Sequence, residues 1–106
     1  MKITLLTVGK IKEKYFTMAI DEYKKRLGRY CKLEIIEVAD EKTPDNASEH
    51  EEDIIRAKEG ERLTKYIKVG AYVISLAIQG KQYSSEEFAD KIDKLGINGV
   101  SHIIFI

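Results

Sequence analysis

Apolar runs and amphipathic segments alternate along this chain. The apolar runs cover residues 2–8, 33–38, 72–78 and 101–106. Short apolar runs without strict alternation are typical of strands in a parallel sheet. In the segments between them, apolar residues recur every three or four positions, which is the spacing of one helix face. The order β-α-β-α-β-α-β predicts an α/β fold with three layers, a parallel sheet with helices on both of its faces.

The first two helices have recognisable apolar stripes. The first is expected from residue 12 to about residue 29, ending near Gly28. The second begins at Ser48, where Ser48 and Glu51 have the spacing of a capping box. We expect their buried stripes to be Phe16, Ile20, Tyr23, Leu27 and Tyr30 in the first and Ile54, Ile55, Leu63, Tyr66 and Ile67 in the second.

Gly60 lies inside the second helix, where glycine costs about 1 kcal/mol relative to alanine. This indicates either close packing against another element or a plain weak point. A third, shorter helix is expected after Ser84, which forms a second capping-box pattern with Glu87. Its apolar positions are Phe88, Ile92 and Leu95.

The third apolar run is the most informative stretch. It begins at Tyr72 and breaks at Gln79-Gly80-Lys81. Because it shows no clean alternation, we expect a strand that is covered on both faces, as in the middle of a parallel sheet. Ligands of open α/β sheets bind beyond the carboxyl ends of the strands. Residues 76–81 are therefore the predicted site.

Composition narrows the class of protein. The 106 residues fit a single domain, residues 1–106, with 43% hydrophobic and 34% charged residues. Eighteen basic and eighteen acidic residues give zero net charge, which argues against a stand-alone nucleic-acid binder but leaves a local basic patch open. The lone Cys31 cannot form an internal disulfide, which suits a reducing compartment. The first apolar run is too short for a signal peptide or a membrane span, so we expect a cytoplasmic protein without a membrane partner.

Few residues offer recognisable chemistry. His50 and His102 lack partners at metal-ligand spacing, so no metal is expected, and His102 is interpreted as a hydrogen-bonded sheet residue. Cys31 is interpreted as structural. Val8-Gly9-Lys10 lacks the upstream glycine and following hydroxyl of a phosphate loop. The basic side of the first helix could hold phosphates, although a solvated face is the favoured interpretation. No general base is identified, and the catalytic residues remain unknown.

Several segments together resemble one known family. They are MKITLLTVGKIKEKY, EYKKRLGRY, LEIIEVADEKTP, KEGERL, ISLAIQGK and SSEEFAD. Over essentially the whole chain they resemble the RlmH family of ribosomal RNA methyltransferases, which belongs to the SPOUT superfamily of α/β-knot enzymes. The resemblance implies a homodimer that transfers a methyl group from S-adenosylmethionine to N3 of a pseudouridine in large-subunit ribosomal RNA.

The resemblance also implies a cofactor pocket. The family has a leucine in a pattern like L-x-x-x-G-K, which matches Leu76. Ala77, Ile78 and Gly80 then belong to the same cofactor-binding loop. Many members carry an acidic residue directly after the leucine, and Ala77 departs from that pattern.

The end of the chain departs from the family as well. The resemblance implies that a strand like HIIFI continues into a glycine-rich loop and further elements that form the knot, whereas this sequence stops at Ile106. We therefore expect a missing carboxyl-terminal segment, and weak or no cofactor binding by the 106-residue chain itself. A methyltransferase represented by its amino-terminal portion and a non-catalytic α/β ligand-binding or protein-interaction module remain as alternative functions.

Overall fold

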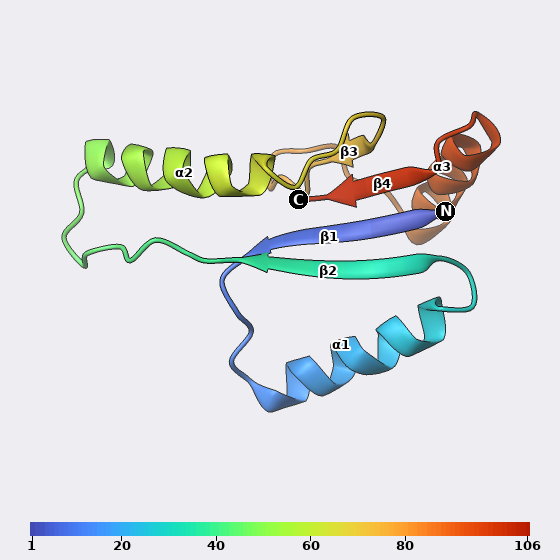
Figure 1. Ribbon diagram of the computed structural model, residues 1–106, viewed down its shortest axis with the longest axis horizontal. Coiled ribbons are helices and arrows are strands. Elements are labelled where there is room, and N and C mark those ends of the chain that lie inside the picture. The colour runs from blue at the N-terminus through green and yellow to red at the C-terminus, as the bar shows by residue number, and fades with distance from the viewer.

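A parallel sheet of four strands forms the centre of the computed structural model, which describes all 106 residues (Figure 1). The strands are β1 (Lys2–Val8), β2 (Lys32–Val38), β3 (Tyr72–Ile74) and β4 (His102–Phe105). They lie side by side in the order β2-β1-β4-β3, and every neighbouring pair is parallel. The predicted α/β class and the alternating order of elements are confirmed.

Three helices connect the strands. They are α1 (Lys14–Leu27), α2 (Glu49–Thr64) and α3 (Ser85–Ile97). Both predicted serine caps are present, because the side chains of Ser48 and Ser84 accept hydrogen bonds from the backbone N–H three residues ahead. α1 is two residues shorter at each end than predicted. No side chain caps its first turn.

The crossovers place the helices in two layers. From β1 to β2 and from β3 to β4 the chain moves across the sheet in one direction, and from β2 to β3 it moves back. Right-handed connections therefore put α1 and α3 on one face and α2 on the other. The ring of Phe88 on α3 contacts the ring of Phe105 on β4, with centroids 5.9 Å apart. The architecture is the predicted three-layer one.

The core is confined to the two central strands and their immediate neighbours. Ile103 and Ile104 on β4 are fully buried, and Leu6 on β1 is nearly so. Thr4 is the one buried polar residue, and its Oγ1 shares a hydrogen bond of 2.8 Å with Nε2 of His102. The expectation that His102 is a hydrogen-bonded sheet residue is confirmed.

The predicted position of β3 in the sheet is wrong. β3 is an edge strand of only three residues, and Tyr72 and Val73 keep more than a third of their surface exposed. The central positions belong to β1 and β4, because β4 returns between β1 and β3. An unbroken apolar run predicts a strand but does not say which partners flank it, and here one edge of β3 has none.

The predicted buried stripes of α1 and α2 are also wrong in part. No residue of either helix is buried, and Phe16 and Tyr23 remain at least half exposed. α2 contacts β1 and β2 with only part of its length and extends past the ends of the strands (Figure 1), so Ile54 on it keeps 44% of its surface exposed. A Cβ added at Gly60 would meet nothing within 4 Å, so close packing does not explain this glycine.

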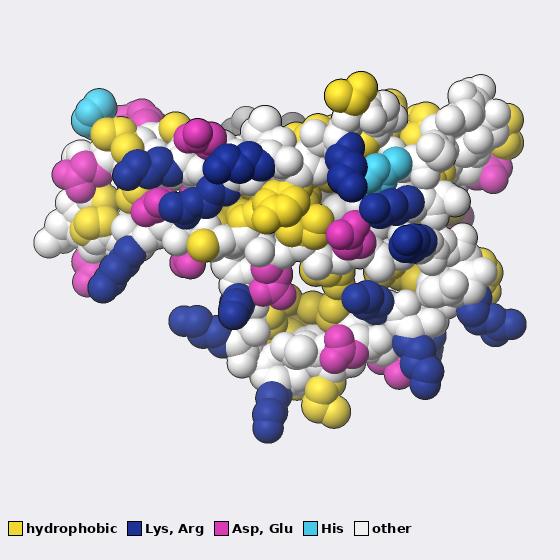
Figure 2. Space-filling view, viewed as in Figure 1, with side chains coloured by type: hydrophobic (Ala, Val, Ile, Leu, Met, Phe, Trp, Pro, Cys, Tyr) yellow, Lys and Arg dark blue, Asp and Glu magenta, His cyan; other side chains and the backbone are white.

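The molecule is extended for its size. Its radius of gyration is 15.9 Å, whereas a compact chain of this length has about 13 Å. Its accessible surface is 8636 Å², against about 6,000 Å² for a compact protein of this mass. One broad face shows hydrophobic side chains at its centre, bordered by Lys and Arg side chains (Figure 2). Considerable apolar surface is therefore available to ligands or partners.

Candidate functional site

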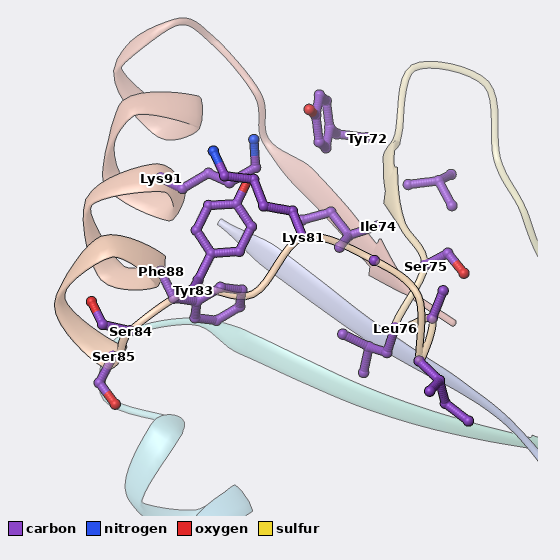
Figure 3. Close-up of a pocket in the computed structure, with 14 residues that line it drawn as sticks. Tyr72, Ile74, Ser75, Leu76, Lys81, Tyr83, Ser84, Ser85, Phe88 and Lys91 are labelled. Atoms are coloured by element: carbon purple, nitrogen blue, oxygen red, sulfur yellow. The ribbon is translucent and has the colours of Figure 1, made fainter.

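A hollow of about 650 Å³ lies at the exit of β3. Its walls come from β3, from the loop that follows, and from the first two turns of α3 (Figure 3). Eight of its fourteen lining residues are hydrophobic. The hollow is at the carboxyl edge of the parallel sheet, where α/β proteins bind their ligands.

Backbone hydrogen bonds to the end of the chain fix how the loop leaves the sheet. The N–H of Ile106 donates to the carbonyl of Ile74 over 3.0 Å, and the N–H of Leu76 donates to the carbonyl of Ile106 over 2.8 Å. The β3–β4 pairing thus continues two residues beyond the strand. Leu76 leaves the sheet in a defined direction, with 69% of its surface exposed. An exposed leucine held on a rigid backbone is suited to contact an apolar ligand.

A tight turn follows Leu76. The N–H of Gly80 donates to the carbonyl of Ala77 over 3.0 Å. A Cβ at position 80 would lie 3.1 Å from that carbonyl oxygen, so glycine permits the close approach. The backbone N–H groups of Ala77 and Ile78 donate no hydrogen bond within the chain, and Ile78 is fully exposed. These donors are free to bind a ligand.

The start of α3 supplies the opposite wall. The Ser84 hydroxyl accepts from the N–H of Glu87 over 3.1 Å, and the Glu87 carboxylate accepts from the N–H of Ser84 over 3.3 Å. This reciprocal capping box stabilises the first turn. It thereby fixes the positions of Tyr83 just before the helix and Phe88 on its second turn, whose rings point into the hollow in Figure 3.

The charged side chains that line the hollow are all basic. Lys81 and Lys91 are its only charged lining residues, and no carboxylate lines it. The Lys81 ammonium lies 5.0 Å from the centre of the Tyr83 ring. The Lys91 ammonium lies 5.9 Å from the ring centres of both Tyr72 and Tyr83. These separations are within the range of cation–π attraction.

The structure brings together all four residues that the sequence predicted for the cofactor loop. Leu76, Ala77, Ile78 and Gly80 all line the hollow. Sequence reasoning missed Tyr83 and Lys91 and interpreted Phe88 only as part of a helix stripe. Tyr83 and Lys91 come close to β3 because the chain turns after Leu76. In the sequence, the only indication of this was an aromatic residue between the Gly-Lys pair and the capping box.

The other sequence candidates lie elsewhere. His50 is exposed at the start of α2, and half-buried Cys31 donates to the carbonyl of Leu27 over 3.6 Å. His102 is at the opposite, amino-terminal end of β4. Its partial burial and the nearby charges of Lys2 and Lys68 lower its pKa, against the opposing effect of Glu34. None of these groups lines the hollow.

No group of three or more His, Cys, Asp or Glu side chains is arranged to hold a metal ion. None of the three helices combines the length and apolar character needed to cross a lipid bilayer.

Comparison with known proteins gives a consistent result. Residues 1–106, the whole chain, match the family described as "Predicted SPOUT methyltransferase". A protein of Bifidobacterium adolescentis named "Ribosomal RNA large subunit methyltransferase H" is 64% identical over all 106 residues. Proteins of the same name from Clostridium beijerinckii and Alkaliphilus oremlandii are 59% and 58% identical. The chain covers 67% of the length of each of these relatives.

Proposed function

Because the chain belongs to the SPOUT methyltransferase family, we propose that it serves the methylation of large-subunit ribosomal RNA, with S-adenosylmethionine as the methyl donor. The acceptor in this proposal is N3 of a pseudouridine. The names of the relatives support the RNA class. The proposal places the protein in the cytoplasm with its ribosomal substrate, and makes it a homodimer in the active state.

One observation carries the proposal. The segment that resembles the family's cofactor loop, residues 76–80, lies at the carboxyl edge of a parallel sheet and forms a wall of the hollow described above. Fold, sequence resemblance and cavity therefore point to the same few residues. A volume of about 650 Å³ is within the range of small-molecule sites.

The residues of the hollow fit the adenosyl part of the donor. Leu76, Ile74 and Phe88 offer apolar surface to an aromatic base, and the free N–H groups of Ala77 and Ile78 offer donors to its ring nitrogens or to a ribose oxygen. The lining includes no carboxylate that could accept from the ribose hydroxyls. These residues therefore contribute one apolar wall of the adenosyl site, together with backbone hydrogen-bond donors.

In this proposal the role of these residues is to position the methyl donor. The bound donor supplies an activated methyl group. Leu76 and Phe88 would exclude water from it, and the rigid turn at Gly80 would hold its orientation. The hollow contains no histidine or carboxylate that could act as a general base. Holding two reactants in a productive geometry can itself lower a barrier by several kcal/mol.

The large accessible surface supports the homodimer in this proposal. The accessible area exceeds that of a compact protein of this mass by about 2,600 Å². Two chains together bring an excess of about 5,200 Å², at the upper end of the total surface that obligate dimers bury. Leu76 and Ile78 contribute to it at the edge of the hollow.

The direct test is calorimetric titration of S-adenosylmethionine into two proteins. One is the 106-residue chain, and the other is a chimaera in which its residues 1–106 replace the matching two thirds of the Bifidobacterium adolescentis relative. We expect heat of binding from the chimaera and little from the chain alone. The chimaera should also transfer labelled methyl groups to large ribosomal subunits, and mass spectrometry of the nucleosides should identify N3-methylpseudouridine.

A matched pair of variants localises the site in the chimaera. Leu76→Asp removes apolar contact with the donor and should weaken binding about tenfold or more. Val69→Asp is the control, because Val69 is equally apolar, fully exposed and outside the hollow. A chimaera that takes up no donor contradicts the proposal. A monodisperse, cooperatively unfolding 106-residue chain would then favour the non-catalytic α/β module.

A further inference from the structure

Positive charge is concentrated at the mouth of the hollow, although the chain as a whole has zero net charge. The sequence balances eighteen basic against eighteen acidic residues. The fourteen residues of the hollow nevertheless include two lysines, Lys81 and Lys91, and no acid. This local excess of two positive charges favours an anionic ligand at the rim of the hollow.

The two lysines alternate with aromatic rings. Their side chains come from different elements, Lys81 from the loop and Lys91 from α3, and converge at the Tyr83 ring in Figure 3. Tyr72 lies on the other side of the Lys91 ammonium. Both tyrosines keep 38% of their surface exposed. Ammonium groups beside accessible aromatic faces suit a chain of phosphates and bases.

The charge of the methyl donor argues against a role for both lysines in holding it. S-adenosylmethionine carries a sulfonium and an amine, both positive, and a single carboxylate. Two ammonium groups beside it would repel the sulfonium unless the carboxylate met both of them. Each nucleotide of RNA, by contrast, brings one negative phosphate and one flat base, which are the complements of Lys81, Lys91 and Tyr83.

We propose that Lys81 and Lys91 contact backbone phosphates of the substrate RNA, and that an adjacent base stacks on Tyr83. This inference rests on the proposed function and assigns its RNA contact to particular residues. The contact guides the acceptor strand across the mouth of the hollow, next to the donor wall formed by Leu76.

The charges around Lys91 indicate on which side of it the RNA lies. A second hollow of about 350 Å³ shares Tyr83 and Lys91, and acidic residues line it. Its only acids are Glu87 and Asp90, which balance Lys91 and Lys94 in the same lining, and Asp90 pairs with Lys94 over 2.8 Å. Positive charge is offset there and is not offset on the loop side of Lys91, so the RNA lies on the loop side, towards Lys81.

The test measures binding of a fluorescein-labelled single-stranded RNA of about ten nucleotides to the 106-residue chain by fluorescence anisotropy. Titrations between about 50 and 200 mM monovalent salt give the salt dependence of the affinity. Lys81→Gln and Lys91→Gln should each weaken binding about fivefold at about 0.1 M salt and reduce the log–log salt slope by about 0.7. Circular dichroism verifies that each variant keeps its helix content.

Two further variants separate charge from stacking. Tyr83→Ala should weaken RNA binding about tenfold without changing the salt slope, whereas Tyr83→Phe retains stacking and should bind like wild type. Lys58→Gln is the control for charge, because Lys58 is exposed on α2, away from the hollow and from the basic side of α1. It should keep the affinity and slope of wild type.

Three results would overturn the proposal. One is an unchanged salt slope in both lysine variants, and another is no RNA binding by the wild-type chain. The third is a loss of donor affinity in the lysine variants of the chimaera without loss of RNA affinity, which would assign the lysines to the donor carboxylate. Methyl transfer by the chimaera tests the proposed function separately, so a chimaera that methylates ribosomal RNA while its lysine variants bind RNA normally would reject only this contact.

Discussion

β4 and the segment that leaves β3 are neighbours with similar apolar sequences and opposite surroundings. Ile103 and Ile104 on β4 expose none of their surface, whereas Leu76 and Ile78 after β3 expose 69% and 102% of theirs. β4 is paired on both edges, and β3 on one. The apolar side chains of β4 therefore stabilise the fold, and those after β3 are free to contact a ligand. Apolar character alone does not distinguish these two uses.

The largest effect should follow from a cavity in the central strand. Ile104→Ala removes a fully buried side chain, and such substitutions cost about 2–5 kcal/mol. The measurement is the free energy of unfolding in urea. A loss of this size is a large fraction of the stability of a small domain. Partial unfolding of the variant in the absence of urea would therefore also agree with the prediction.

The edge strand provides the matched control. Val73 pairs with Ile104 in the β3–β4 register and keeps 40% of its surface exposed. Val73→Ala should therefore cost clearly less than Ile104→Ala. Equal losses at the two positions would remove the distinction between a buried central strand and an open edge strand.

A smaller effect concerns the amino-terminal end of β4. The pKa of His102 is lowered by partial burial and by Lys2 and Lys68. Between this lowered value and the usual pKa of about 6.5, the unfolded chain binds more protons than the folded chain. The contribution of His102 to stability is therefore present above about pH 6.5 and lost as the pH falls below it. Urea midpoints measured across this range should decrease on acidification.

Variants assign that pH dependence to one histidine. His102→Asn should remove the decrease that His102 causes. His50→Asn, at an exposed position on α2, should retain it. The same pH profile in wild type and His102→Asn would mean that another group causes the decrease.

The smallest effect extends the comparison from the edge strand to α2. An added Cβ at Gly60 meets nothing within 4 Å, so Gly60→Ala should raise the free energy of unfolding by about 0.5–1 kcal/mol. Gly80→Ala is the contrast, because its Cβ would crowd the carbonyl of Ala77 at 3.1 Å. A destabilised Gly60→Ala protein would show that α2 packs more closely than the structure indicates.

Much of the fold was predictable because its signals are local. Apolar runs gave four strands, and serine caps at Ser48 and Ser84 gave the starts of two helices. The end of an apolar run at Gly80 also located one wall of the hollow. These features depend on neighbouring residues in the chain, whose chemistry is visible in the sequence.

Strand order, helix burial and the composition of the site were not predictable in this way. β3 became an edge strand, Phe16 and Tyr23 stayed exposed, and Lys91 came to lie beside Tyr72. Each outcome depends on which elements meet across the sheet. The amphipathic period of a helix shows that one face is apolar but not how much of that face another element covers.

The sequence by itself determined that this chain alternates strands and helices, carries a family pattern around Leu76, and has a glycine where the loop turns. Only the tertiary structure decided that β1 and β4 form the core, that the exit of β3 is open, and that two lysines and two tyrosines meet at its rim. Local hydrogen bonding and periodicity fix the former. The latter follow from right-handed crossovers and from contacts between residues far apart in the chain.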